Sequence, residues 1–261
     1  MACIIEHHKI LGFVLKCRII LQLIKLSIQK ITNTVNKIGI RIKFCTTFRV
    51  LTQMSLSSKF TFTRFSYHSG DWDTDQRMPA NILNSLMEYT TIPIDTKEKV
   101  VALSSPDVFN SPFAYMSGHK LVQFDAQERA NFKKYVQNGG FVFVDDCNHD
   151  IDGLFAKSFE AQMASLFGPQ ALKKIPNNHE IYRSFFTFEK GPPNTSFELN
   201  GWGDDLVHDY LKAITINGRI AVLYSNKDYG CEWDYDFRNK RFLAEDNTKF
   251  GVNIVVYAMS S

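Results

Sequence analysis

Titratable side chains crowd the segment that follows an apolar run at residues 141–144. Five of them fall within eight residues: Asp145, Asp146, His149, Asp150 and Asp152. Carboxylates and imidazoles act as general acids and bases, and carboxylate oxygens are the ligands that Mg²⁺ and Ca²⁺ prefer. A divalent metal held here could activate water for hydrolysis. No recognised metal-binding spacing is present, so the alternative is that these acids cap a helix or face solvent.

Histidines elsewhere could complete such a site. His119 follows Ser117-Gly118 at the end of another predicted strand, and the candidate catalytic residues are therefore Asp145, Asp146, His119 and His149. His179 could act as a general base or hold a substrate by a hydrogen bond. A single histidine in a loop is more often a structural residue, and we expect His68 and His208 at the surface.

Further polar and aromatic residues are candidates for ligand binding. They are Arg64, Tyr67, Asp71, Trp72, Tyr115, His179 and Arg219. The two arginines could clamp an anionic ligand through paired hydrogen bonds, or could pair with Asp145 or Asp71 instead. Trp72, together with Trp202 and Trp233, could form apolar walls of a pocket or could anchor loops.

Cys147 is a poor candidate nucleophile. It follows a predicted central strand, as a glutaminase nucleophile would, but its neighbours are Asp146 and Asn148 rather than glycines. Nearby carboxylates raise the pKa of a thiol and so lower the fraction of reactive thiolate. Cys147 and Cys231 belong to no CxxC pair, which mildly favours a reducing compartment.

Charge and missing motifs exclude several classes of function. Residues 1–53 carry nine Lys/Arg and one acid, whereas residues 54–261 carry 21 basic and 26 acidic side chains. The acidic part has no basic stripe, so nucleic acid is not an expected partner. Because GxGxxG, P-loop, GxSxG and paired CxxC motifs are absent, we expect no nucleotide, flavin or zinc-ribbon site.

The acidic part alternates between strand-like and helix-like patterns. Strands are expected at residues 59–65, 99–103, 113–116, 141–144, 213–216 and 219–224, the last two forming a hairpin around Asn217-Gly218. Helices are expected near residues 79–87, 125–138, 153–167 and 248–259. Asp125 and Glu128 form a capping-box pattern at the second helix. The pattern predicts one α/β domain over residues 59–261, with a mostly parallel sheet, helices on both faces and an antiparallel edge.

This architecture places the chemistry at one edge of the sheet. Residues 141–144 are apolar at every position, which is typical of a central parallel strand covered on both faces. Ligands of open parallel sheets bind beyond the carboxyl ends of the strands. We therefore expect the loops at residues 67–73, 117–119, 145–150 and 228–234 to meet there.

We expect residues 1–58 to be a basic extension outside the fold. The apolar run 10–28 is broken by Lys16, Arg18 and Lys25, so we expect no transmembrane span. Neither a secretory signal nor its cleavage site is clear. The expected location is the cytoplasm, with export or membrane association through the extension as the alternative.

Several ordered motifs resemble one family. They are Arg64–Trp72, Pro112–His119, Asn138–Cys147, Asn217–Arg219 and Phe250–Ile254. Together they are similar to the bacterial domain-of-unknown-function family DUF4159, from about Phe60 to Met259. The resemblance implies a flavodoxin-like three-layer αβα sandwich related to class I glutamine-amidotransferase-like domains, and it implies no particular activity.

Two functions follow from these observations. The first is a module that binds a small polar ligand or a protein partner in a degenerate amidotransferase-like cleft. The second is a hydrolase of a small amide or carbohydrate-like substrate that uses the acids and histidines, with or without a divalent metal. We favour the first, because the residues of a glutaminase triad are missing.

Overall fold

The structure, a computed structural model, describes residues 59–234 and 244–261. The expectation for residues 1–58 lies outside this range. The strands are β1 (Thr63–Ser66), β2 (Lys99–Ala102), β3 (Phe113–Gly118), β4 (Phe141–Asp146), β5 (Lys173–Lys174), β6 (Lys212–Ile216) and β7 (Arg219–Ser225). The α-helices are α3 (Met78–Tyr89), α4 (Ala126–Gln137), α5 (Leu154–Phe167), α6 (Ser196–Leu199), α7 (Tyr229–Asp234) and α8 (Ala244–Ser260), with 3-10 turns η1 (Pro106–Asn110) and η2 (Glu180–Arg183).

The strands form one seven-stranded sheet in the order β2-β1-β3-β4-β7-β6-β5. The first five strands in this order are parallel, and β6 and β5 add an antiparallel edge. This confirms the predicted fold class. The parallel strands follow the doubly wound order 2-1-3-4-5, in which the direction of the connections reverses between β1 and β3.

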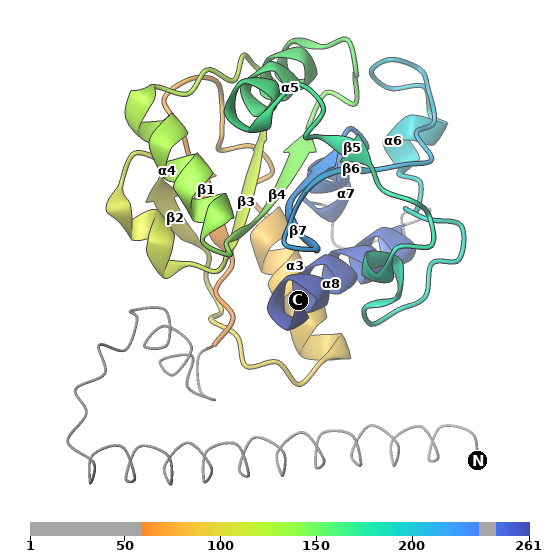
Figure 1. The fold of residues 1–261 in the computed structure, drawn as a ribbon. Helices are drawn as coiled ribbons and strands as arrows, with labels where there is room; N and C mark the ends of the chain where they lie inside the picture. Colours follow the sequence, from red (N-terminus) through yellow and green to blue (C-terminus); the bar gives the residue numbers. More distant parts are fainter. Residues whose placement is uncertain (1–58, 235–243) are drawn as a thin grey trace, which may run out of the picture. The chain divides into compact units, whose positions relative to one another are not determined.

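Helices cover both faces of the sheet (Figure 1). Because successive strand residues point to opposite faces, Phe141 and Phe143 pack with α3, α7 and α8, whereas Val142 and Val144 pack with α4 and α5. This explains why the β4 run is apolar at every position. The prediction of a central covered strand is confirmed.

The helix ends follow local sequence signals. Asp125 accepts a hydrogen bond from the Glu128 N–H, and Glu128 accepts one from the Asp125 N–H, so the predicted capping box is confirmed. Pro79 lies in the first turn of α3. The short helix α7 was not predicted, because its six residues are too few for a helical period to show. Among the described residues, no helix has both the length and the apolarity that crossing a membrane requires.

Candidate functional site

Direct contacts join three of the loops expected at the carboxyl edge. The Tyr67 hydroxyl donates to the Ser117 carbonyl at 2.8 Å, and Asp71 accepts from the His119 N–H at 2.9 Å. The Asn148 side-chain amide donates to the His119 carbonyl at 2.8 Å. The loops after β1, β3 and β4 therefore pack together at the point where the strand order reverses.

The two adjacent aspartates of β4 point to opposite faces. The strand runs through Asp146, two residues beyond the predicted end, because Ser117 and Gly118 of β3 continue the pairing. Asp145 accepts from the Gly230 N–H at 2.6 Å on the side of α7. Asp146 accepts from the Asn148 N–H and from the Asn226 side chain. The two carboxylates are therefore not placed as one acidic pair in a loop.

Asp145 belongs to a polar group that we call the acid cluster. Its members are Asp75, Tyr115, Asp145, Cys147, Asp228 and Cys231. The Cys147 thiol donates to one Asp75 oxygen at 3.2 Å, and the Cys231 thiol donates to the other at 3.1 Å. Asp75 and Cys231 are half-buried at the rim, and the other members are buried.

The backbone is strained to build this cluster. Asp75 and Asp228 adopt left-handed conformations, with φ of 52° and 56°. Such conformations are uncommon for residues other than glycine and concentrate at functional sites. A Cβ at Gly230 would lie 2.5 Å from an Asp75 oxygen and would also collide with the Tyr115 hydroxyl. Glycine is therefore required where α7 closes over the cluster.

Burial raises the pKa of two acids of the cluster, Asp145 and Asp228. Desolvation raises the pKa of Asp145 to about 8, despite the hydrogen bond from Gly230, and raises the pKa of Asp228 well above its ordinary value. Three buried atoms have no hydrogen-bond partner among the described residues: Tyr115 Oη, Asp145 Oδ1 and Asp228 Oδ2. No ion pair to a cation involves these acids in the described part of the chain. The cluster therefore contains several buried oxygen atoms without a hydrogen-bond partner among the described residues.

The surroundings of Cys147 do not favour a nucleophilic role. A hydrogen bond with Cys231, together with burial and the nearby Asp75 carboxylate, raises the pKa of Cys147 well above its ordinary value. The thiolate is the reactive form of cysteine. This agrees with the sequence-based argument against a Cys147 nucleophile.

His119 is held by Asp71 as a general base would be. Its Nδ1 lies 2.9 Å from Asp71 Oδ2, and 43% of its side chain is exposed. Although partial burial opposes it, hydrogen bonds from the backbone and ring of His119 lower the pKa of Asp71. The arrangement orients the ring, and Nε2 forms no hydrogen bond with the described residues.

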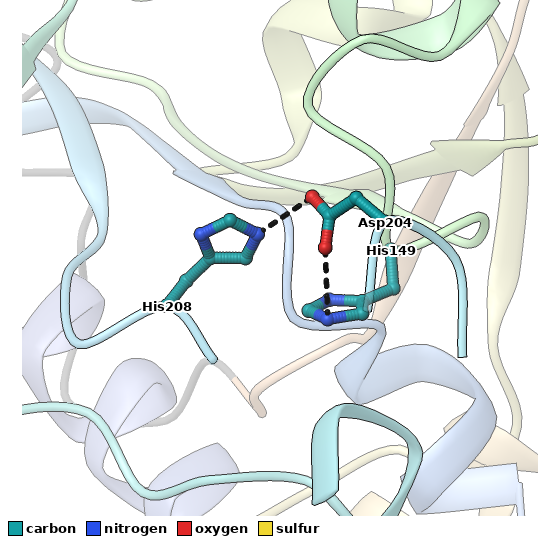
Figure 2. Close-up of side chains that lie close together, drawn as sticks. All are labelled: His149, Asp204 and His208. Atoms are coloured by element: carbon teal, nitrogen blue, oxygen red, sulfur yellow. Dashed lines mark hydrogen bonds and ion pairs between the residues drawn. The ribbon is translucent and has the colours of Figure 1, made fainter. Parts of the chain in front are cut away.

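His149 is buried and engaged at both ring nitrogens. Nδ1 donates to the Asn226 carbonyl, and Nε2 lies 2.8 Å from the Leu206 carbonyl and 3.6 Å from Asp204. A base needs a free nitrogen, so this geometry does not favour the catalytic role expected for His149. Asp204 lies between His149 and His208 (Figure 2).

The sequence-based reasoning missed His208 and Asp204. His208 is buried rather than at the surface, so that prediction is wrong. Its Nε2 lies 2.9 Å from Asp204. The signal that could have revealed the pair is the segment Gly201-Trp202-Gly203-Asp204, in which both glycines adopt positive φ and turn the chain back on itself.

Arg64 and two tryptophans have structural surroundings. Arg64 is buried, pairs with Glu98 at 3.0 Å and donates to the carbonyls of Trp72, Thr74 and Asp75, so it shapes the loop before α3 rather than pairing with Asp145 or Asp71. Trp72 is half-buried beside the core, and Trp233 lies inside it. Arg64 thus supports the strained Asp75 backbone.

His179 and Arg219 lie away from this site. Arg219 begins β7 and donates to Gly140, which precedes β4, so it lies at the amino-terminal edge of the sheet. His179 packs against Tyr257, whose hydroxyl accepts from the Ile220 N–H at the same edge. The structure therefore does not bring these two residues together with Asp145.

Two cavities also lie elsewhere. One of about 390 Å³ is lined by residues of η2 and the end of α8, and one of about 460 Å³ lies along β6 beside His179. The remaining acids of the predicted metal group are scattered: Asp152 is exposed and pairs with Lys157, while Asp150 accepts from the Asp152 N–H.

Comparison with known proteins assigns the chain to a family. The molecule is an α/β domain with an acid-rich carboxyl edge, and residues 61–259 match the family described as a domain of unknown function, DUF4159. The chain therefore belongs to the DUF4159 family. A search of the curated proteins found no match.

Proposed function

We propose that this chain is a binding module whose acid cluster takes a small polar ligand bearing an ammonium group. The observation that carries the proposal is the set of buried, unpartnered oxygens of Tyr115, Asp145 and Asp228. Buried polar atoms without partners are costly, and a bound ligand that donates hydrogen bonds removes that cost.

The charge of the cluster favours a cationic ligand. Asp75, Asp145 and Asp228 form no ion pair in the described part of the chain, and burial opposes the ionisation of Asp145 and Asp228. The buried Lys227 interacts electrostatically with Asp145, but it forms its ion pair with Glu198. A ligand ammonium group would favour the ionised carboxylates and donate three hydrogen bonds. A ligand would enter beside Asp75 and Cys231, the half-buried members.

A panel of small amines tests this function. Ethanolamine and 1,3-diaminopropane are expected to raise the unfolding temperature of the native chain, whereas glycerol is not. Asp145→Asn should abolish the shift, and the exposed Asp152→Asn should keep it. Equal shifts in the native chain and Asp145→Asn, or no shift with any amine, would contradict the proposal.

A hydrolase of a small amide or carbohydrate-like substrate is the second candidate, because Asp71 orients the exposed ring of His119. In that case, a broad hydrolase screen of the native chain should give turnover that His119→Gln lowers by about 100-fold or more, the scale of general-base catalysis. Turnover unchanged in His119→Gln would remove this candidate.

A further inference from the structure

His149, Asp204 and His208 form a compact group outside the acid cluster. His149 lies in the loop after β4, and the other two lie in the loop before β6, so the group joins segments about 55 residues apart, as Figure 2 shows for the side chains. One donor atom from each residue lies within 4.8 Å of the other two. His149 and His208 are buried, and Asp204 is nearly so.

His149 Nε2 faces two oxygen atoms that accept hydrogen bonds. Nδ1 already donates to the Asn226 carbonyl, and Nε2 faces the Leu206 carbonyl and Asp204 Oδ1. Both of these oxygens are acceptors. A neutral ring with its hydrogen on Nδ1 would aim the Nε2 lone pair at them. Either a second proton or a metal ion at Nε2 resolves this conflict.

The donor spacing fits a zinc ion. Bonds of 2.0–2.1 Å in a tetrahedral site place neighbouring ligand atoms about 3.3 Å apart. The separations here are 3.6 Å from His149 Nε2 to Asp204 Oδ1, 2.9 Å from His208 Nε2 to Asp204 Oδ2, and 2.8 Å from His149 Nε2 to the Leu206 oxygen. These three separations differ from the tetrahedral value by about 0.3–0.5 Å.

The hydrogen-bond partners of His149 and Asp204 resemble those of metal ligands in other proteins. Ligating histidines usually donate the other ring N–H to a carbonyl, as His149 does to Asn226. Asp204 accepts from the N–H groups of Ile151 and Leu206. The carboxylate also contacts His208 Nε2, and these contacts fix it in position.

Backbone contact fixes the second loop against the first. The Asp204 N–H donates to the His149 carbonyl at 3.0 Å, and a Cβ at Gly203 would collide with that carbonyl. His149 itself has a positive φ of 48°. The two loops therefore hold the donors in place before any ion binds.

We propose that His149 Nε2, the Asp204 carboxylate and His208 Nε2 bind one Zn²⁺, with the Leu206 carbonyl as the fourth donor. Two imidazoles select a borderline metal over Mg²⁺ or Ca²⁺. Four protein donors make the site structural, and the ion ties the loop at residues 201–208 to the loop after β4. The site is independent of the acid cluster.

A second group provides a matched control. His68, Asp125 and Glu128 also bring three donors within 4.8 Å, but His68 is exposed, and both acids are engaged in the α4 capping box. His68→Asn therefore removes a comparable histidine without touching the proposed site.

The experiment is a titration of the metal-free full-length chain with Zn²⁺, followed by calorimetry and by metal analysis after gel filtration. We expect a high-affinity site holding one ion per chain. His149→Asn, Asp204→Asn and His208→Gln should weaken this site by more than the ~100-fold that losing an outer partner costs. Asparagine tolerates the left-handed backbone of position 149. His68→Asn should bind as the native chain does.

Two further readouts separate loss of binding from loss of folding. Unfolding in a chelator should show that the Asp204→Asn chain is folded. Zn²⁺ should raise the unfolding temperature of the native and His68→Asn chains, and should leave that of Asp204→Asn unchanged. Co²⁺ bound in place of Zn²⁺ should give the visible bands of a tetrahedral ion without a thiolate charge-transfer band. Native-like affinity in His149→Asn and His208→Gln, a thiolate band, or no bound ion in the native chain would each overturn the proposal.

Discussion

At the scale of single residues, Asp145 is a fully buried carboxyl group at the carboxyl edge of the sheet. Sequence placed it correctly beyond an apolar run, because an uninterrupted apolar strand must be central and must end at the carboxyl edge. The sequence predicted that the loop at residues 228–234 lies at this edge, but it did not predict that the Asp75 and Asp228 side chains group with Asp145. Asp75 and Asp228 lie 70 and 83 residues away, and their positions depend on loop conformations with positive φ.

The first prediction concerns the protonation of Asp145. Its folded pKa of about 8 lies above the ordinary value of 3.8, so between pH 6 and 8 the folded chain holds a proton that the unfolded chain has released. Stability attributed to this group is present at low pH and is lost as pH rises, by about 2 kcal/mol across this window. Asp145→Asn should remove this fall in the free energy of unfolding between pH 6 and 8.

Urea unfolding of the two chains at pH 6, 7 and 8 measures this difference. Asp152→Asn, at an exposed carboxylate, should retain the native slope. If the native chain and Asp145→Asn lost stability in parallel, Asp145 would be ionised across the whole window.

The second prediction concerns the unpartnered Tyr115 hydroxyl. Because a buried hydroxyl without a partner costs about 1–3 kcal/mol, Tyr115→Phe should stabilise the free chain by about 1 kcal/mol. The same change should weaken binding of ethanolamine, measured by calorimetry. A variant that is destabilised and binds ethanolamine normally would show that the hydroxyl has a structural partner instead.

At the scale of elements, the acid cluster depends on α7 and on the loop between β1 and α3. The longer helices and the strands were predictable because hydrophobic periodicity and capping residues are local signals, as at Asp125 and Glu128 of α4. The six residues of α7 carry no such signal. The need for glycine at position 230 becomes visible only in the structure, where a Cβ would collide with the Tyr115 hydroxyl and an Asp75 oxygen.

The third prediction tests that closure. Gly230→Ala should destabilise the chain by about 1–3 kcal/mol, because its methyl group would overlap the Tyr115 hydroxyl and an Asp75 oxygen. Adding Tyr115→Phe should recover part of the loss, which a double-mutant cycle in urea would detect. Strictly additive effects would place position 230 away from Tyr115.

The fourth prediction concerns the start of α4. Asp125→Ala removes the side chain that caps the helix and should cost about 1 kcal/mol in thermal unfolding. Lys133→Ala, at an exposed position of the same helix, is the control and should change stability by less than about 0.5 kcal/mol. Equal effects of the two substitutions would contradict the capping role.

At the scale of the whole molecule, one edge of the sheet gathers most of the unusual chemistry. The expectation that four loops meet there follows from the rule that ligands of open parallel sheets bind beyond the carboxyl ends of the strands. The contacts of Tyr67, His119 and Asn148 join three of these loops, and the hydrogen bond from the Gly230 N–H to Asp145 joins the fourth. His179 and Arg219 were predicted as ligand-binding residues from sequence motifs, but they lie at the opposite edge of the sheet. The length of the strands separates residues near the strand starts from residues near the strand ends.

Calorimetric titration of ethanolamine into the native chain at pH 6.5 and 8.5 tests ligand binding at this edge most directly. If the ammonium ion replaces protons held by the acid cluster, affinity rises with pH, and protons are released to the buffer. Asp145→Asn should bind weakly at both pH values. Native affinity that is equal at the two pH values, with no proton release, would contradict a ligand seated among these carboxyl groups.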